Sequence, residues 1–441
     1  MTEQSNNQRA SRRRFLGVST ALLSTPLFSR HVLGNQTELA INGGNKTVTS
    51  RYPKRPRWGA AELAQLTEML KQSSLFYWKG PRTELFKQRF QQHHPATHVH
   101  TCSSGTAALH IAVAAAGIKP GDEVITAPIT DIGTVTGILF QQAVPVFADL
   151  EPHTYNLSVE DVKQKITPKT RAIIAVHLAG NPCNMQALQQ LADEHNLVLI
   201  EDAAQAWGAR YNGQPVGTIG HFGCFSMMNS KHISTGDGGV VCSDNDKYGP
   251  LMQKYGDKGT DRITRESAEV LASNYRMSEP QAAVGAAQLN RLENIVATRN
   301  RLARLLTSEI ADIPGLTPMI ERDQDRCAYW FYYFRLDHKR FSCDRNQFTK
   351  ALVAEGMGAS AGYIKTPVYT YPMFQKHAFF NGSWPLKDMG LTAMDYRRVS
   401  CPEAVAILNT GIRFRISEDM SDGYIRQIGA AVRKVAKHYA A

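Results

Sequence analysis

Short apolar runs alternate with stretches of helical spacing between residues 124 and 200. The apolar runs cover 124–126, 144–149, 172–176 and 197–200, while 158–166 and 185–195 repeat apolar residues at helical intervals. Alternation of strand and helix is typical of a largely parallel sheet covered by helices on both faces, because each parallel crossover returns through a helix. The sequence therefore predicts an α/β fold, and its 441 residues are enough for two domains with separate cores.

The composition is that of a globular protein, with 43% hydrophobic and 20% charged residues. The formal net charge is +11, and the first 34 residues contribute four of these charges through five arginines and one glutamate. The remaining positive charge is consistent either with phosphorylated or nucleotide-linked substrates or with general solubility. The sequence contains no block of Lys and Arg with interleaved aromatic residues, so it gives no indication of nucleic-acid binding.

The N-terminal segment 11–17 reads S-R-R-R-F-L-G, and a weakly apolar stretch extends to residue 28. This stretch is shorter than the roughly 20 apolar residues of a membrane span. Residues 1–35 resemble a twin-arginine export leader, which predicts passage through the twin-arginine (Tat) translocase to the periplasm. No A-x-A site follows Pro26, so a membrane anchor stays open. If the segment is only a basic tail, the protein stays cytoplasmic.

Seven cysteines occur, and their number is odd. No two of them form a C-x-x-C pair, and several lie in apolar surroundings, at positions 102, 183, 224, 242, 327, 343 and 401. We expect buried free thiols, with neither a disulfide framework nor a metal site. Free thiols also suit folding in a reducing compartment before any export.

One lysine stands out in the stretch 225–241. Lys231 lies between the apolar run 222–225 and a glycine-rich turn that leads into the strand-like run 240–242. A lysine desolvated by such a loop can act as an amine nucleophile and hold a carbonyl cofactor as a Schiff base. Taken alone, the signal is weak, because most lysines are solvated surface charges.

Two upstream segments favour the cofactor-binding interpretation of Lys231 over the surface lysine. The apolar run 196–202 ends in Glu201 and Asp202, and ligands of open α/β sheets bind beyond the carboxyl ends of the strands. A carboxylate there can keep a pyridinium nitrogen protonated. In 102–115 a small polar loop opens an Ala-rich helix, whose free N–H groups, dipole and Thr106 hydroxyl make a phosphate site. Together these parts are what pyridoxal 5'-phosphate requires.

At these residues the chain resembles the DegT/DnrJ/StrS-type family of pyridoxal-phosphate-dependent aminotransferases, many of which act on sugars. The resemblance begins near residue 39 and rests on S-G-T-A-A-L at 104–109, G-D-E-V-I-T at 121–126, V-H-L-A-G at 176–180, E-D-A-A-Q at 201–205, S-x-x-x-x-K at 226–231, T-G-D-G-G at 235–239, N-Y-R-M at 274–277 and Q-A-A-V-G at 281–285. It implies fold type I: a large domain, 36–300, with a mostly parallel seven-stranded sheet between helices, and a small C-terminal α/β domain, 301–441.

The resemblance also implies roles for matching residues. Lys231 would be the Schiff-base lysine and Asp202 the partner of the pyridinium nitrogen. The other cofactor-binding positions would be Gly105, Thr106 and Ser226 at the phosphate, Gln205 near the phenolic oxygen, and Asn274, which reaches the phosphate from the neighbouring subunit. That last role implies a homodimer with a shared active site.

The implied reaction transfers an amino group from glutamate or glutamine to a keto group, as in amino-sugar or polysaccharide biosynthesis. The acceptor would be a nucleotide sugar or a cyclitol. Two alternatives stay open: a pyridoxal-phosphate enzyme of another type, such as a lyase, and a non-catalytic regulatory relative. A lysine rather than a histidine at position 231 argues against the sugar-dehydratase branch.

Three departures from the family pattern fall where substrate should lie. The slot that usually holds an aromatic residue stacked on the cofactor ring is Asp131. The tyrosine that often follows V-H-L is Ala179, and the P-L-H-like segment reads P-V-Y at 367–369. These changes leave the acceptor open.

The C-terminal half is predicted more coarsely. A capping-box pair, Ser278 and Gln281, opens a helix-compatible stretch to residue 310, and we place the change of domain near 300. We expect a strand at 329–336 and helices at 345–355 and 421–438, with the aromatics Trp330 and Tyr332 in the core. The loop 362–372 carries four residues that face either substrate or core: Tyr363, Lys365, Tyr369 and Tyr371.

Overall fold

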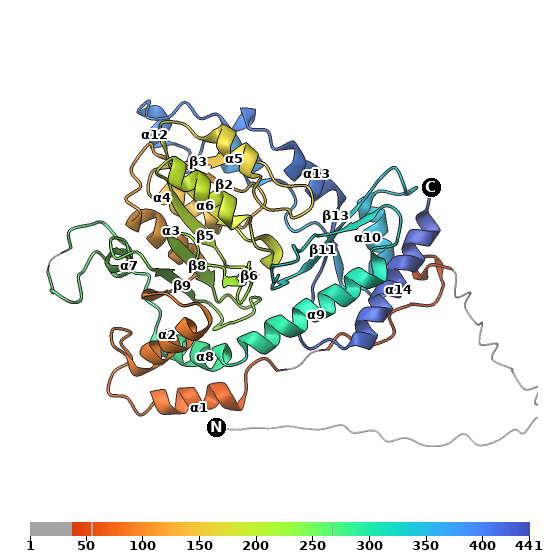
Figure 1. The fold of residues 1–441 in the computed structure, drawn as a ribbon, viewed down its shortest axis with the longest axis horizontal. Coiled ribbons are helices and arrows are strands. Elements are labelled where there is room, and N and C mark those ends of the chain that lie inside the picture. The colour runs from red at the N-terminus through yellow and green to blue at the C-terminus, as the bar shows by residue number, and fades with distance from the viewer. Residues whose placement is uncertain (1–37, 54–55, 267) are drawn as a thin grey trace, which may run out of the picture.

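The computed structural model describes residues 38–53, 56–266 and 268–441. Within them, a seven-stranded sheet has the strand order β1-β9-β8-β5-β4-β2-β3, and only β9 runs antiparallel to its neighbours (Figure 1). The strands are β1 (His98–Cys102), β2 (Glu123–Thr126), β3 (Val144–Phe147), β4 (Thr170–Val176), β5 (Val198–Asp202), β8 (Phe222–Ser226) and β9 (Gly239–Ser243). This sheet confirms the predicted α/β fold.

Central strands form where the sequence is continuously apolar. All five residues of β5 and of β8 are buried, as expected for strands covered on both faces. The run predicted at 144–149 ends earlier, at Phe147. Asp149 leaves the sheet because its carboxylate accepts the backbone N–H groups of Glu403 and Ala404, both at 2.8 Å, at the start of a later helix.

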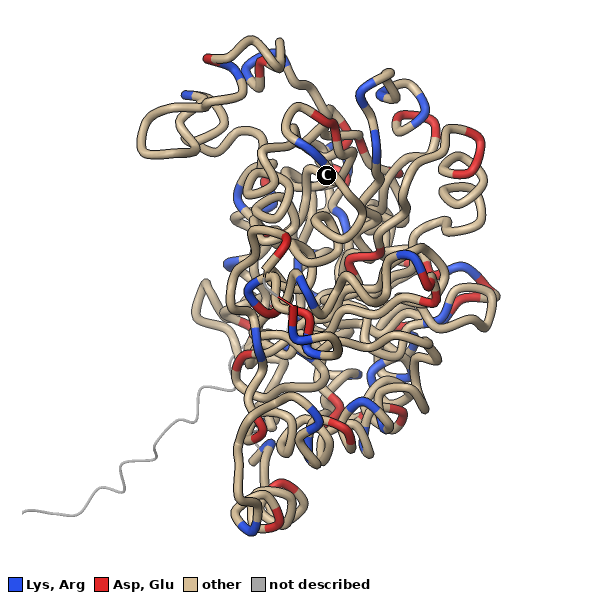
Figure 2. The backbone as a smooth tube through the Cα atoms, turned by 90° about the vertical axis from the view of Figure 1, so that its left-hand side faces the viewer, with Lys and Arg blue, Asp and Glu red and all other residues tan. Residues whose placement is uncertain are grey.

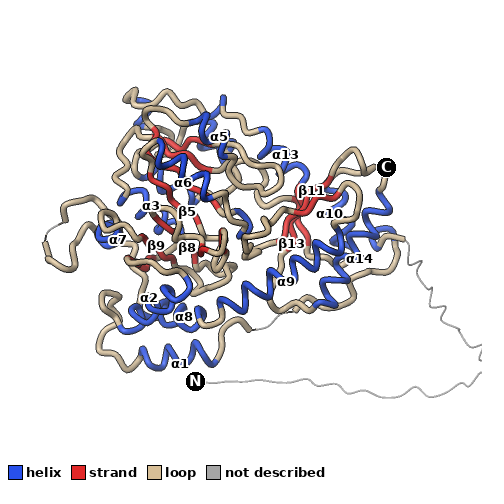
Figure 3. The backbone as a smooth tube through the Cα atoms, viewed as in Figure 1, coloured by secondary structure: helices blue, strands red, loops and turns tan. Residues whose placement is uncertain are grey.

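Helices lie on both sides of the large sheet (Figure 3). Among them α3, which follows β1, contacts α4, α7, β8 and β9, while α5 and α6 contact each other and α1 and α2 both pack on α8. Their bounds are α1 (Ala60–Met69), α2 (Pro81–His93), α3 (Gly105–Ala115), α4 (Gly133–Phe140), α5 (Val159–Lys165), α6 (Met185–Glu194), α7 (Gly249–Gly256) and α8 (Glu279–Leu289). The helices expected at 158–166 and 185–195 are thereby confirmed.

The stretch predicted as one helix from 278 to 310 is two helices, α8 and α9 (Leu292–Ile310). The capping box forms at its start, where Gln281 Oε1 accepts the Ser278 N–H at 3.2 Å. The break falls where Arg291 turns to the N-terminal segment, pairing with Glu62 and donating to the Arg57 carbonyl at 3.2 Å. Residue 300, the expected domain boundary, lies inside α9, and the boundary stays a prediction.

A second, antiparallel sheet forms the C-terminal part, with the order β10-β11-β13-β12. Its strands are β10 (Leu316–Pro318), β11 (Tyr332–Leu336), β12 (Ala359–Ala361) and β13 (Gly411–Phe414). The helices are α10 (Arg345–Ala354), α11 (Pro372–Gln375), α12 (Pro385–Asp388), α13 (Pro402–Thr410) and α14 (Asp422–Tyr439), and α14 packs along α9 (Figure 1). Both predicted helices of this region are confirmed, and the strand predicted at 329–336 begins later, at Tyr332.

The remaining short elements are β6 (Arg210–Tyr211), β7 (Gln214–Pro215), η1 (Ala40–Asn42), η2 (Leu178–Gly180), η3 (Val368–Thr370) and η4 (Tyr396–Arg398). All seven cysteines have free thiols, and only Cys343 is not fully buried. Lys and Arg are interspersed with Asp and Glu along the tube in Figure 2. The predicted leader lies outside the described residues; within them, the structure has no helix with the length and apolar character of a membrane span.

Candidate active site

A cavity of about 200 Å³ lies at the carboxyl ends of β5 and β8. It brings together five predicted site residues from four separate segments: Gly105 and Thr106 at the start of α3, Asp202 at the end of β5, Ser226 at the end of β8, and Lys231 from the following loop. The rest of the wall is Ser104, Leu109, Asp131, Gly133, Thr134, Ala204, Met228, Asp237, Trp330 and Tyr363. The β5 end is where the α/β topology predicts a ligand.

Lys231 is 6% exposed, and its Nζ lies 3.6 Å from the centroid of the Trp330 ring. Burial lowers the pKa of this amine to about 8, against the opposing charges of Asp202 and Asp131. The loop is held from behind by Arg57, whose guanidinium donates to the carbonyls of Asn229 at 2.5 Å, His232 at 2.6 Å and Lys231 itself. Lys231 is therefore a buried amine that loses its proton more easily than an exposed lysine, on a loop held by Arg57.

Asp202 is 5% exposed and both of its carboxylate oxygens are occupied. Oδ2 accepts the hydroxyl of Thr134 at 2.8 Å, and Oδ1 accepts the Ala204 N–H at 3.1 Å. Burial raises the pKa of Asp202, while the Thr134 hydroxyl, the Ala204 N–H and Lys231 lower it. Thr134 is itself held by Thr130, Oγ1 to Oγ1 at 2.6 Å. The carboxylate is thus fixed in place at the floor of the cavity.

Another part of the cavity wall is built by the first turn of α3. Ser104 caps this helix by accepting the Ala107 N–H at 3.1 Å. In the described part of the chain, the N–H groups of Gly105 and Thr106 have no acceptor. A Cβ on Gly105 would lie 2.7 Å from Ser226 Cβ, so only glycine lets the helix start approach the end of β8 this closely. The positive end of the helix dipole therefore faces the cavity with free donors.

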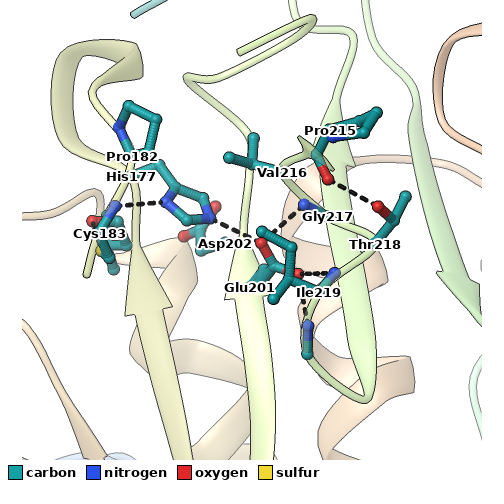
Figure 4. A network of polar contacts seen from close by, with 12 residues as sticks. His177, Pro182, Cys183, Glu201, Asp202, Pro215, Val216, Gly217, Thr218 and Ile219 are labelled. Carbon is teal, nitrogen blue, oxygen red and sulfur yellow. Dashed lines mark hydrogen bonds and ion pairs between the residues drawn. The ribbon is translucent and has the colours of Figure 1, made fainter. Parts of the chain in front are cut away.

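The side chain of Glu201, one residue before Asp202, lies on the opposite face of β5 (Figure 4). Its carboxylate accepts the Gly217 N–H and the N–H groups of Ile219 and Gly220, each at 2.7 Å, and lies 3.0 Å from His177 Nε2. His177 Nδ1 accepts the Cys183 N–H at 3.0 Å, so the proton of the neutral ring is on Nε2 and points to Glu201. The Glu201 carboxylate thus holds the 217–220 loop and the loop that carries His177 against the sheet, and it does not line the cavity.

The two other predicted cofactor residues lie outside the cavity wall. Gln205 is buried beside it; its Oε1 accepts the Ala179 N–H at 2.9 Å and its Nε2 lies 3.5 Å from the Tyr363 hydroxyl. Asn274 is exposed and accepts the Arg276 Nε–H at 2.7 Å. The structure therefore groups five of the seven predicted residues, and the roles assigned to all seven stay predictions.

Four aromatic assignments are now resolved. Trp330, expected in the core, lines the cavity over Lys231, because its backbone N–H donates to the Ala179 carbonyl at 2.8 Å and its ring N–H to Ser230 at 2.8 Å. Tyr332 is buried, as predicted. From the loop 362–372, Tyr363 reaches the cavity, while Tyr369 packs on Phe147 instead.

The residues present fit pyridoxal phosphate. The unpaired N–H groups at the start of α3 and the Thr106 hydroxyl suit a phosphate, and the buried carboxylate of Asp202 suits a pyridinium nitrogen. Thr134 and Trp330 also line this cavity. No sequence pattern indicated Thr134. A seven-stranded, mostly parallel sheet with a strand-end aspartate and a buried lysine in one cavity defines the fold type I class of pyridoxal-phosphate enzymes.

Comparison with known proteins identifies the family. The model of the DegT/DnrJ/EryC1/StrS aminotransferase family matches residues 56–433. The chain therefore belongs to this family of pyridoxal-phosphate-dependent aminotransferases, as its motifs predicted.

Individual relatives agree with this assignment. The chain is 36% identical to GDP-perosamine synthase of Vibrio cholerae over 312 residues, which cover 70% of this chain and 83% of that one. It is 33% identical over 360 residues, 79% and 85% of the two chains, to a Streptoalloteichus tenebrarius protein provisionally named L-glutamine:3-amino-2,3-dideoxy-scyllo-inosose aminotransferase. The crystal structure of 3-amino-5-hydroxybenzoic acid synthase superposes with a TM-score of 0.78 at 27% identity, covering 88% and 99% of the two chains.

If Lys231 holds the cofactor, we expect cofactor loading to depend on pH. With the pKa of Lys231 at about 8, its neutral, nucleophilic fraction rises about tenfold between pH 7 and pH 9. We expect the rate at which cofactor-free protein binds pyridoxal phosphate covalently, followed by stopped-flow absorbance, to rise by that factor and then level off. Asp131→Asn removes a carboxylate that raises this pKa and should move the midpoint to lower pH. A rate independent of pH in this range would contradict the assignment.

Proposed function

We propose that this cavity binds pyridoxal phosphate through Lys231 and that the protein transfers an amino group from glutamate or glutamine to a keto group of a sugar nucleotide or cyclitol. The observation that carries the proposal is the placement of the Lys231 amine in one buried cavity with Asp202 and the free N–H groups of α3. GDP-perosamine synthase and the scyllo-inosose enzyme, both similar to this chain, support the sugar or cyclitol acceptor.

When bound, pyridoxal phosphate supplies an electron sink that stabilises negative charge on the substrate carbon. The chain's own residues do the rest. Asp202, held by Thr134 and Ala204, would keep the ring nitrogen protonated, and the start of α3 would hold the phosphate. The Lys231 amine would take a proton from the substrate carbon as general base and pass it to the cofactor carbon as general acid. Its lowered pKa suits both directions near neutral pH.

An absorbance spectrum tests this function. Purified protein loaded with cofactor should absorb near ~420 nm, and glutamate or glutamine should convert that band to a pyridoxamine band near ~330 nm. A band that neither donor changes would favour another reaction, such as elimination. Absence of any band after incubation with pyridoxal phosphate would leave the non-catalytic relative and overturn the proposal.

We further propose a homodimer in which Asn274 completes the partner's site. Asn274 is exposed and outside the cavity of its own chain, which agrees with a role across an interface. Lys231→Ala and Asn274→Ala should each be inactive, yet a mixture should regain roughly a quarter of wild-type activity, since half of the dimers are mixed and each has one intact site. A mixture as inactive as its parents, with subunit exchange shown by mass spectrometry, would contradict sharing.

We also propose export through the twin-arginine pathway, supported by S-R-R-R-F-L-G at 11–17. Replacing Arg12 and Arg13 together by lysine keeps the charge but removes the paired guanidinium groups. The variant should accumulate in the cytoplasm, whereas Arg9→Lys should be exported like the wild type. Immunoblots of cell fractions distinguish these outcomes, and equal cytoplasmic retention of all three proteins would contradict the proposal.

A further inference from the structure

A second cavity lies between the C-terminal half of α9 and the edge strand β10, and we call it the α9–β10 cavity. It measures about 530 Å³ and shares no wall residue with the cavity around Lys231. A volume of roughly 300–1,000 Å³ is typical of cavities that bind small molecules. The apolar part of its wall consists of Ala311, Leu316, Pro318, Met319, Ile320 and Tyr329.

The charged groups of this wall leave one carboxylate free. Arg304 Nε lies 3.3 Å from Glu321 Oε2. Glu321 Oε1 accepts the Asn300 side-chain N–H at 2.7 Å and the Cys327 backbone N–H at 2.8 Å. Asp323, the third charged wall residue, forms no hydrogen bond or ion pair with any residue that the structure describes. The cavity therefore presents an apolar surface beside an unneutralised negative charge, which favours an organic cation.

Tyr329, a buried wall residue, has a strained backbone. Its φ is +46°, in the left-handed region, where a bulky side chain is rare. Such a conformation persists only where the surrounding structure holds it, and it is often found where a segment has a functional task. The Tyr329 ring stacks on Tyr332 with centroids 6.1 Å apart, and its hydroxyl donates to Glu321 Oε2 at 3.3 Å. The contacts that hold this strained residue therefore lie at the α9–β10 cavity.

The neighbours of Tyr329 contact the Lys231 cavity and its loop. The Ala328 carbonyl accepts the Nε2–H of His232, the residue after Lys231, at 2.9 Å. Trp330 lies over the Lys231 amine, with Nζ 3.6 Å from its ring centroid. The segment 328–330 thus lines the α9–β10 cavity through one residue and touches the lysine loop through the two on either side.

We propose that the α9–β10 cavity is an effector site for a small organic cation with an aromatic or alicyclic body, and that its occupancy stabilises the 328–330 segment and with it the position of Lys231. A ligand that binds only the ordered conformation of Tyr329 makes every opening that disrupts this conformation less favourable. The inference goes beyond the proposed amino transfer and does not depend on it, because it concerns a separate cavity.

Saturation-transfer NMR titrations of the purified protein, incubated with pyridoxal phosphate, test the ligand class. Three probes share a benzyl body and differ in charge: benzyltrimethylammonium, benzyl alcohol and phenylacetate. None has a primary amine that reacts with the cofactor. The cation should bind about fivefold or more tightly than phenylacetate, since an exposed ion pair contributes up to about that factor. Asp323→Asn should remove most of this preference, whereas Asp388→Asn, at an exposed carboxylate outside the cavity, should keep it.

A filled cavity tests the location of the site. Ala311 is exposed at the C-terminal end of α9, so Ala311→Phe should fold normally, which circular dichroism checks, and should weaken all three probes about tenfold or more. Ala430→Phe, at an exposed alanine of α14 outside the cavity, is the matched control and should bind them like the wild type. Binding that survives unchanged in Ala311→Phe would overturn the site.

Hydrogen exchange followed by mass spectrometry tests the coupling to Lys231. With benzyltrimethylammonium at ten times its Kd, exchange should slow up to about tenfold in peptide 327–332 and about twofold or more in peptide 229–234, since openings that release the ligand become less populated. Peptide 345–354 of α10 does not line the cavity and should exchange as before. This readout needs no turnover, and the absorbance change with glutamate scores the proposed function separately. Equal affinity for the cation and phenylacetate, or saturation that leaves peptide 229–234 unchanged, would overturn the inference.

Discussion

Lys231→Ala is expected to lower the rate of amino transfer by about 10³-fold or more, since general acid–base catalysis alone contributes about 10²–10⁴. The variant loses the covalent attachment of the cofactor and the amine that moves the proton. It should still bind the cofactor non-covalently, because the N–H groups of α3 and the Asp202 carboxylate are untouched. Single-turnover absorbance with glutamate measures the rate. Borohydride reduction followed by mass spectrometry reports whether the cofactor is attached.

Lys350→Ala is the matched control, because Lys350 is exposed on α10. It should retain the wild-type rate and the borohydride-fixed cofactor. Added methylamine should restore part of the Lys231→Ala rate by supplying a mobile amine to the cavity. If Lys231→Ala turned over like the wild type, or still carried the reduced cofactor covalently, another residue would have to be the nucleophile.

Glu201→Ala is expected to destabilise the protein by about 3–5 kcal/mol, because each buried donor left without a partner costs about 1–3 kcal/mol. The Glu201 side chain is fully buried and accepts three backbone N–H groups besides lying 3.0 Å from His177 Nε2. Its loss leaves all four donors without a partner in the interior. Urea unfolding of the cofactor-free protein, followed by far-UV circular dichroism, measures the change in the free energy of unfolding.

Two further variants make this result specific. Glu194→Ala removes an exposed carboxylate on α6 and should change stability by no more than about 0.5 kcal/mol. Glu201→Gln keeps the volume and one acceptor oxygen, so its loss should be intermediate. An unfolding midpoint for Glu201→Ala equal to that of Glu194→Ala would show that the network in Figure 4 does not contribute to stability.

Much of the cavity could be predicted from the sequence because its parts are local. Asp202 could be predicted because it ends an apolar run, and Thr106 because it follows the polar loop that opens an Ala-rich helix. Trp330 and Thr134 could not be located in this way. Each reaches the cavity through contacts with distant residues, Trp330 through Ala179 and Thr134 through Asp202, and no local pattern encodes such pairs.

Glu201 and Asp202 show most clearly which properties the sequence determined and which the tertiary structure decided. The sequence by itself determined that a buried strand ends in two carboxylates, because strand periodicity and apolar content are properties of neighbouring residues. Only the tertiary structure decided their tasks, since successive side chains point to opposite faces of a sheet and each face meets different partners. Asp202 meets Thr134 in the cavity, while Glu201 meets the 217–220 loop. Long-range packing, which assembles segments from residue 104 to residue 363, made one of them a candidate catalytic group and the other a structural one.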